Sequence, residues 1–95
     1  MFLVSLTYKK PLAEVDLHLP AHVEYLETQY RAKNFLVSGR KVPRIGGVIL
    51  AHVETREKLD EILKQDPFYR HQVADYDVTE FVPSMTCPEL AFLKK

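Results

Sequence analysis

The sequence predicts an α+β fold in which four strands and two helices follow the order β-α-β-β-α-β. Three observations lead to this prediction. Residues 2–8 alternate with a period of two, residues 17–33 repeat apolar side chains at helical spacing, and residues 48–51 are apolar on both alternating faces. The order is that of a split βαβ plait. We therefore expect one domain over residues 1–95, with an antiparallel four-stranded sheet and both helices on one face.

The four strands are expected at residues 2–8, 35–41, 46–53 and 74–82. Each stretch is rich in aromatic or β-branched residues and is bounded by proline, glycine or charged residues. Gly39 in the second strand predicts a bulge or a close approach of two backbones. Because the third strand is apolar on both faces, while helices cover only one face of so small a sheet, a second subunit is the simplest cover for the other.

The first helix is expected to end near Asn34, which suits a left-handed cap. Pro20 lacks an amide hydrogen and belongs in a first turn. We therefore place the effective start of the helix at Asp16 or Leu17 and treat residues 12–15 as a looser lead-in.

The second helix is expected to begin after Thr55, a good N-cap residue. Asp66-Pro67 stops this helix, because a residue before proline avoids the helical region. Residues 68–73 are expected to form a loop or short turn. The tail over residues 83–95 has no clear period and is expected to wrap a neighbouring subunit or to stay mobile.

Leu19, Val23, Leu26 and Tyr30 fall on one side of the first helix and predict its core-facing stripe. His22 lies on the shoulder of this stripe, where an imidazole is half sheltered. It is the one polar residue that breaks the apolar pattern, and this makes it the first candidate for a functional role.

Asp66 is the natural partner for His22, because in this plait the first helix and the C-terminal end of the second lie over the same side of the sheet. A carboxylate that accepts from one ring nitrogen fixes the tautomer and raises the basicity of the other, which suits a general base. Spacing alone favours the plainer interpretation, an edge-of-core histidine and an aspartate that merely ends a helix, because histidine at intermediate burial is common.

Composition narrows the classes of function. The formal net charge is zero, so nucleic acid and anionic membranes are not expected partners, and no apolar run approaches the length of a membrane span. The single cysteine, Cys87, allows no internal disulfide, and the N-terminus lacks the features of a signal peptide, so we expect a cytoplasmic protein.

No metal site is expected. His18 and His22 have i,i+4 spacing, but the acidic residue of the zinc-protease motif is missing between them. His52 and His71 are expected at the surface. Ser38 and Gly39 offer a hydroxyl and an amide to a ligand oxygen, although a bulged strand explains them equally well.

Several short motifs together resemble the YciI-like (YCII-related) proteins, which are members of the dimeric α+β barrel group. The motifs are Pro20-Ala21-His22, Ser38-Gly39, the glycine-led third strand and Asp66-Pro67-Phe68. The resemblance implies a ferredoxin-like protomer, a homodimer that pairs sheet faces, and an active site centred on His22 and Asp66. One departure concerns Arg40, where the family often has proline after Ser-Gly. A guanidinium there would select an acidic substrate or point to solvent.

Two hypotheses about function follow. The first is a small homodimeric lyase or isomerase without metal or redox cofactor, in which His22 and Asp66 are catalytic. Its substrate is a small, cyclic or anionic metabolite, and the residues expected to bind it are Ser38, Gly39, Arg40, Pro67 and Phe68. The second is a non-catalytic module that binds a small molecule or a protein.

Overall fold

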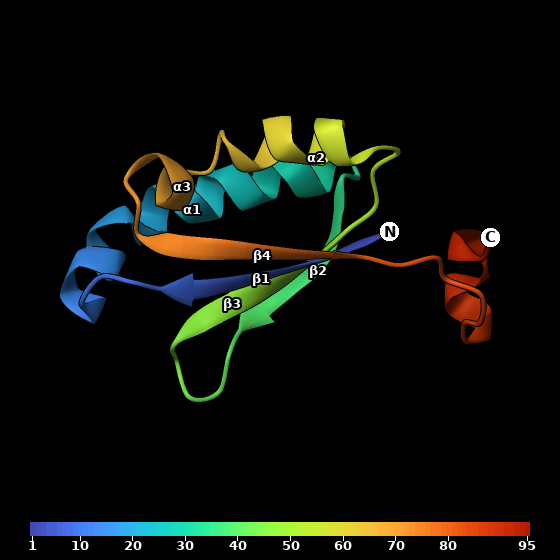
Figure 1. The fold of residues 1–95 in the computed structure, drawn as a ribbon, viewed down its shortest axis with the longest axis horizontal. Coiled ribbons are helices and arrows are strands. Elements are labelled where there is room, and N and C mark those ends of the chain that lie inside the picture. Colours follow the sequence, from blue (N-terminus) through green and yellow to red (C-terminus); the bar gives the residue numbers. More distant parts are fainter.

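A computed structural model describes all residues from 1 to 95 and confirms the predicted fold class. A four-stranded antiparallel sheet, in the order β2-β3-β1-β4, carries its helices on one face (Figure 1). The elements are β1 (Phe2–Tyr8), α1 (Leu12–Arg31), β2 (Phe35–Arg40), β3 (Gly46–Ala51), α2 (Arg56–Leu63), α3 (Pro67–Arg70), β4 (Ala74–Glu80) and the 3-10 helix η1 (Pro88–Leu93).

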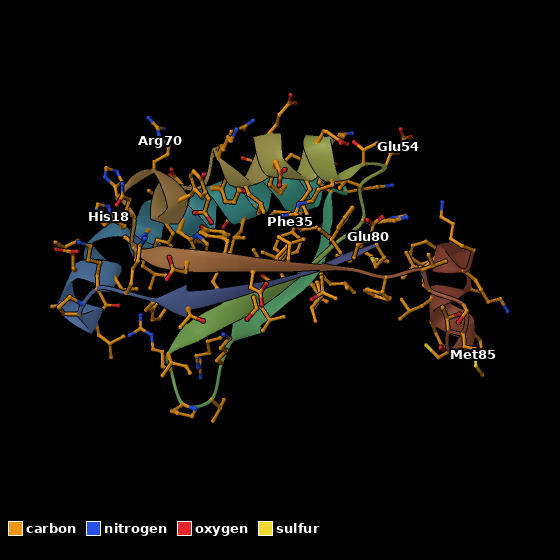
Figure 2. All side chains as sticks on the ribbon, viewed as in Figure 1. His18, Phe35, Glu54, Arg70, Glu80 and Met85 are labelled. Atoms are coloured by element: carbon orange, nitrogen blue, oxygen red, sulfur yellow. The ribbon has the colours of Figure 1, made fainter.

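The central strand β1 shows the predicted alternation, since Phe2, Val4 and Leu6 are all buried in the core beneath the helices. In Figure 2 the ring of Phe35, at the start of β2, also lies between the helices and the sheet. A side chain at Gly46 would place Cβ 1.8 Å from the carbonyl oxygen of Leu6. The close approach of two backbones therefore occurs at Gly46, and β3 needs glycine there.

Helix α1 begins at Leu12, earlier than predicted, and Pro20 lies inside it. The proline ring leaves the carbonyl group of Asp16 without its intrahelical amide donor. Both residues are exposed, so water can satisfy this carbonyl, and the helix tolerates the proline.

Lys33, not Asn34, is the left-handed residue at the end of α1, with φ of 61°. The amide of Lys33 donates to the carbonyl of Tyr30 at 2.9 Å, and the amide of Asn34 donates to that of Gln29 at 3.0 Å. These two bonds form a Schellman motif, which places the left-handed residue one position before its second donor. The prediction therefore chose the right turn but assigned the left-handed conformation one residue too late.

The buried stripe of α1 also differs from the prediction. It consists of Val15, His22, Tyr25 and Gln29, three of which carry polar atoms. The stripe predicted from apolar residues lies along one edge of the buried one, and Val23 within it is 42% exposed. His22 is therefore central to the buried face and not on its shoulder.

The Thr55 cap of α2 is confirmed, since its hydroxyl accepts from the amide of Lys58 at 3.1 Å. The helix ends at Leu63, three residues before Asp66. Asp66 instead begins α3, a four-residue helix in a segment expected to be a loop or short turn, and Pro67 occupies its first turn. The dipeptide that was predicted to stop one helix in fact starts the next, because aspartate before proline is also a favourable helix start.

The register of the edge strand β2 shifts between Phe35 and Val37, so the irregularity lies at Leu36 and not at Gly39. Gly39 pairs regularly with Val48 of β3. The strands β2, β3 and β4 end one or two residues before their predicted limits.

The sheet face opposite the helices is open in the single chain (Figure 1). On it Leu3 and Val37 are 40% and 58% exposed. The C-terminal tail extends beyond the end of β4, and Met85 within it is 88% exposed (Figure 2). The tail folds back on itself through a bond from the amide of Lys95 to the carbonyl of Pro83.

None of the helices combines the length and the apolar character that crossing a membrane requires.

Candidate active site

The carboxylate of Asp66 is fully buried and accepts three hydrogen bonds. Oδ1 accepts from the amide of Phe68 at 2.9 Å and from Nδ1 of His22 at 2.8 Å, and Oδ2 accepts from the hydroxyl of Tyr76 at 2.5 Å. The bond to Phe68 is the N-cap of α3, so the helix start fixes the orientation of the side chain. All three contacts use the carboxylate as the acceptor, so its two oxygens hold the three donors around one point.

The structure thus brings together His22 and Asp66, which are 44 positions apart in the sequence. Because the other two partners of this carboxylate donate to it, we assign the same role to His22, with the imidazole proton on Nδ1 and the free lone pair on Nε2. The His22 side chain is only 11% exposed. Because water is largely excluded there, the hydrogen bond between His22 and Asp66 is stronger than the same bond would be at the protein surface.

Phe68 covers one face of the imidazole. The two rings are stacked with centroids 3.9 Å apart and planes inclined by 3°. Phe68 in turn forms an edge-to-face pair with Tyr8, with ring centroids 6.0 Å apart and planes at 88°. These contacts hold the imidazole plane, so the hydrogen bond to Asp66 sets its direction and Phe68 sets its tilt.

A cleft of about 190 Å³ opens beside His22, between α1 and the strands β2 and β3. Four of the predicted site residues line it together with His22, and the others do not. Asp66 lies behind the imidazole, and Pro67 lies in the first turn of α3 away from the cleft. The lining residues are Leu6, Tyr8, Leu19, His22, Val23, Leu26, Ser38, Gly39, Arg40, Gly46, Gly47, Val48, Ile49 and Phe68.

Ser38 and Gly39 contribute differently to the cleft. The hydroxyl of Ser38 is hydrogen-bonded to the hydroxyl of Tyr30, which keeps it in a fixed position on the cleft wall. The amide of Lys41 donates to the carbonyl of Gly46, and the antiparallel pattern turns the amide of Gly39 toward β3 as well. Gly39 therefore supplies space rather than a donor, contrary to the role suggested for its amide.

Comparison with known proteins identifies the family. The family model described as "YCII-related domain" matches residues 1–82. The chain belongs to the YCII-related family. This confirms the resemblance seen in the short motifs of the sequence, and the match ends where the C-terminal tail begins. A search of curated proteins gave no match.

Among solved structures, this YCII-related protein is similar to 5-chloro-2-hydroxyhydroquinone dehydrochlorinase (TftG) from Burkholderia phenoliruptrix AC1100, in complex with 2,5-dihydroxybenzoquinone. The TM-score is 0.67 and the sequence identity is 19%, with 85% of this chain and 93% of that chain covered. At this identity the likeness establishes a shared fold and nothing more.

Sequence reasoning missed two tyrosines of the YCII-related site, Tyr76 and Tyr25. Burial, with the nearby charge of Asp66, raises the pKa of each phenol above its ordinary value, so both remain donors. Tyr76 donates to Asp66, and Tyr25 donates to the carbonyl of Ile62 at 2.8 Å. A signal for Tyr76 was present, because the alternation of β4 turns it toward the helices, where a buried carboxylate needs donors.

This pKa shift of Tyr76 predicts a loss of stability in alkaline solution. Below pH 10.0, the ordinary tyrosine value, the phenol is protonated in both the folded and the unfolded chain. Above it only the unfolded chain loses the proton, so the free energy of unfolding falls by about 1 kcal/mol per pH unit for this residue. Urea unfolding between pH 9 and 11 should therefore show a steeper loss in the wild type than in Tyr76→Phe. Parallel slopes in the two proteins would contradict this.

The remaining histidines have other neighbours. His18 stacks on His71 with centroids 4.2 Å apart, which joins α1 to the end of α3 (Figure 2 shows His18 at this end). His52 contacts Phe92 of the tail through ring centroids 6.5 Å apart. His18 and His22 thus have different partners, and only His22 lines the cleft.

Proposed function

We propose that this YCII-related protein is a small enzyme, a lyase or isomerase, that moves a proton on a small cyclic compound. The observation that carries the proposal is the buried bond from His22 Nδ1 to Asp66, which leaves Nε2 as the free nitrogen of a ring that lines the cleft. An imidazole that is held within hydrogen-bond distance of its substrate is an effective general acid and base near neutral pH.

In the proposed reaction Nε2 of His22 removes a proton from a carbon or hydroxyl of the substrate. The imidazolium that forms is stabilised by the ionised carboxylate of Asp66. The same proton then returns to another atom of the substrate, which gives isomerisation, or a leaving group departs from the neighbouring carbon, which gives elimination. Neither route requires a metal or a redox cofactor, and Ser38 would contact a substrate oxygen.

The size of the cleft supports a substrate with one ring. An apolar cavity of about 150 Å³ accepts benzene, and this cleft measures about 190 Å³. Apolar side chains of Leu6, Leu19, Leu26 and Ile49 line much of it, and polar groups are few. The similar structure holds a hydroxylated quinone. Hydroxylated six-membered rings are therefore the compounds to test first.

We also propose that two copies form the active protein by pairing their open sheet faces. Leu3 and Val37 remain exposed on that face in the single chain, and Phe92 of the tail is 66% exposed. Covering these apolar surfaces would bring the tail against the second copy. Sedimentation equilibrium should then give the mass of two chains.

An exposed free thiol at Cys87 suits a reducing cytoplasm, where we place the enzyme.

The proposal is tested by proton exchange. Ring compounds, beginning with 5-chloro-2-hydroxyhydroquinone and 2,5-dihydroxybenzoquinone, are incubated with the protein in deuterated buffer, and exchange or chloride release is followed by NMR and ion chromatography. We expect the wild type to accelerate one of these reactions and His22→Gln to lose about 100-fold or more of the rate.

His52→Gln is the matched control, because His52 lies beside the tail and outside the cleft. It should retain the full rate. Compounds that bind beside His22 without exchange or elimination would indicate a non-catalytic binding module. A rate that survives in His22→Gln would exclude His22 as the base.

A further inference from the structure

A second hollow, of about 420 Å³, adjoins the cleft and is lined by Tyr8, Asp16, Leu19, Arg40 and Arg44. Three of these residues, Tyr8, Leu19 and Arg40, line the cleft as well. The two hollows therefore share a boundary, and a ligand that occupies the first can extend into the second. We call this neighbouring space the outer hollow.

The two arginines of the outer hollow differ in their partners. The guanidinium of Arg44 donates to the carboxylate of Asp16 at 2.5 Å, and this pair is electrically neutral. Arg40 takes part in none of the ion pairs or side-chain hydrogen bonds of the chain. The boundary thus carries one uncompensated positive charge, and it belongs to Arg40.

Strand β2 sets the position of Arg40. Arg40 lies opposite Gly47 in the ladder, two residues after Ser38, which lies opposite Ile49. Because alternate residues share a face, Arg40 and Ser38 both project from the face that carries the helices. The free guanidinium and the Ser38 hydroxyl therefore face the cleft from the sheet, across from the helix that carries His22.

We propose that Arg40 forms a carboxylate subsite, so that the ligand is a six-membered ring in the cleft with a carboxylate directed into the outer hollow. The ring position rests on the proposed function. The cleft has room for little more than one substituted ring, and the shared boundary gives a further group a route past Arg40 into the outer hollow. A guanidinium matches the planar, two-oxygen geometry of a carboxylate. One free positive charge also matches this monoanion better than a phosphate dianion.

The subsite is tested with benzoate and its neutral analogue benzamide as probes. Each is titrated into the labelled protein while NMR follows the His22 ring proton and the Arg40 side-chain NH. Benzoate should shift both signals in the wild type. In Arg40→Met, which keeps the aliphatic part of the side chain, its affinity should fall roughly tenfold or more, whereas benzamide should bind both proteins equally.

Lys41→Met is the matched control, because Lys41 is the next residue but bonds to the hydroxyl of Thr7. It should leave benzoate affinity nearly unchanged. Arg40→Lys should lose less affinity than Arg40→Met, because it keeps the charge without the planar fork. Added salt should weaken benzoate binding to the wild type more than to Arg40→Met.

Three outcomes would overturn the subsite. These are no benzoate binding to the wild type, an equal loss in Lys41→Met and Arg40→Met, and stronger binding of inorganic phosphate than of benzoate. The catalytic proposal is tested separately with His22→Gln. If that variant binds benzoate with the same dependence on Arg40, the subsite stands even where no turnover is found.

Discussion

Asp66→Asn is expected to lower turnover by about 10² to 10⁴-fold while the chain keeps its fold. Asparagine has nearly the same shape, so it can still accept from the Phe68 amide that begins α3. It lacks the negative charge that stabilises the imidazolium of His22. With its oxygen kept on the Phe68 amide, the same neutral oxygen faces Nδ1 of His22, and the new NH2 group lies beside the hydroxyl of Tyr76. His22 then has a weaker acceptor behind it and is a poorer base in the cleft.

This result is measured by comparing rates for the ring compound that the wild type converts. NMR of the His22 ring in Asp66→Asn should show the Nδ1 proton resonance moved from its wild-type position, because a neutral amide oxygen is a weaker acceptor than a carboxylate. Asp60→Asn is the control, since Asp60 forms only an exposed pair with Arg56 on α2. Unchanged turnover in Asp66→Asn would show that the buried bond is structural and that His22 does not depend on it.

Features of the fold that rest on neighbouring residues could be predicted from the sequence. The alternation of Phe2, Val4 and Leu6 placed the central strand correctly, and Thr55 identified the start of α2. Each depends on side chains a few positions apart. Where two local interpretations competed, the sequence could not decide between them. The dipeptide Asp66-Pro67 is favourable both at the end of one helix and at the start of another. The folded structure shows that it begins α3.

The buried face of α1 shows why local pattern was insufficient for the site. The prediction assumed that polar residues face solvent, so it chose a stripe of apolar residues. The deepest positions are instead occupied by His22, Tyr25 and Gln29. Burial of the first two is tolerated because their partners, Asp66 and the carbonyl of Ile62, come from elements 44 and 37 positions away. The predicted apolar stripe has a different place in the structure, since Leu19 and Leu26 line the cleft.

The family motifs contributed what spacing could not. His22 and Asp66 were selected as a pair from the topology of the plait together with the resemblance, and the structure brings them within 2.8 Å. Tyr76 is absent from those motifs. Its contact with Asp66 follows from the pairing of β4 with β1, which places Tyr76 opposite Leu6. The third member of the buried network therefore required the strand register.

Asp66→Ala is expected to destabilise the fold by roughly 3–5 kcal/mol, far more than Asp66→Asn. Alanine removes the acceptor for the His22 ring, the Phe68 amide and the Tyr76 hydroxyl at once. All three donors are wholly or largely shielded from water, and each unsatisfied donor carries a desolvation cost. The loss also removes the cap that begins α3.

Urea unfolding measures this effect, with Asp60→Ala as the control. The exposed i,i+4 pair of Asp60 with Arg56 should contribute only about 0.3–0.5 kcal/mol. If Asp66→Ala cost no more than Asp60→Ala, the buried network would not hold the fold together. The two substitutions at Asp66 separate its two roles, because asparagine keeps the acceptor for α3 and removes the charge, whereas alanine removes both. A large loss of turnover with a small loss of stability in Asp66→Asn, and a large loss of stability in Asp66→Ala, would show that one carboxylate both starts α3 and orients the base.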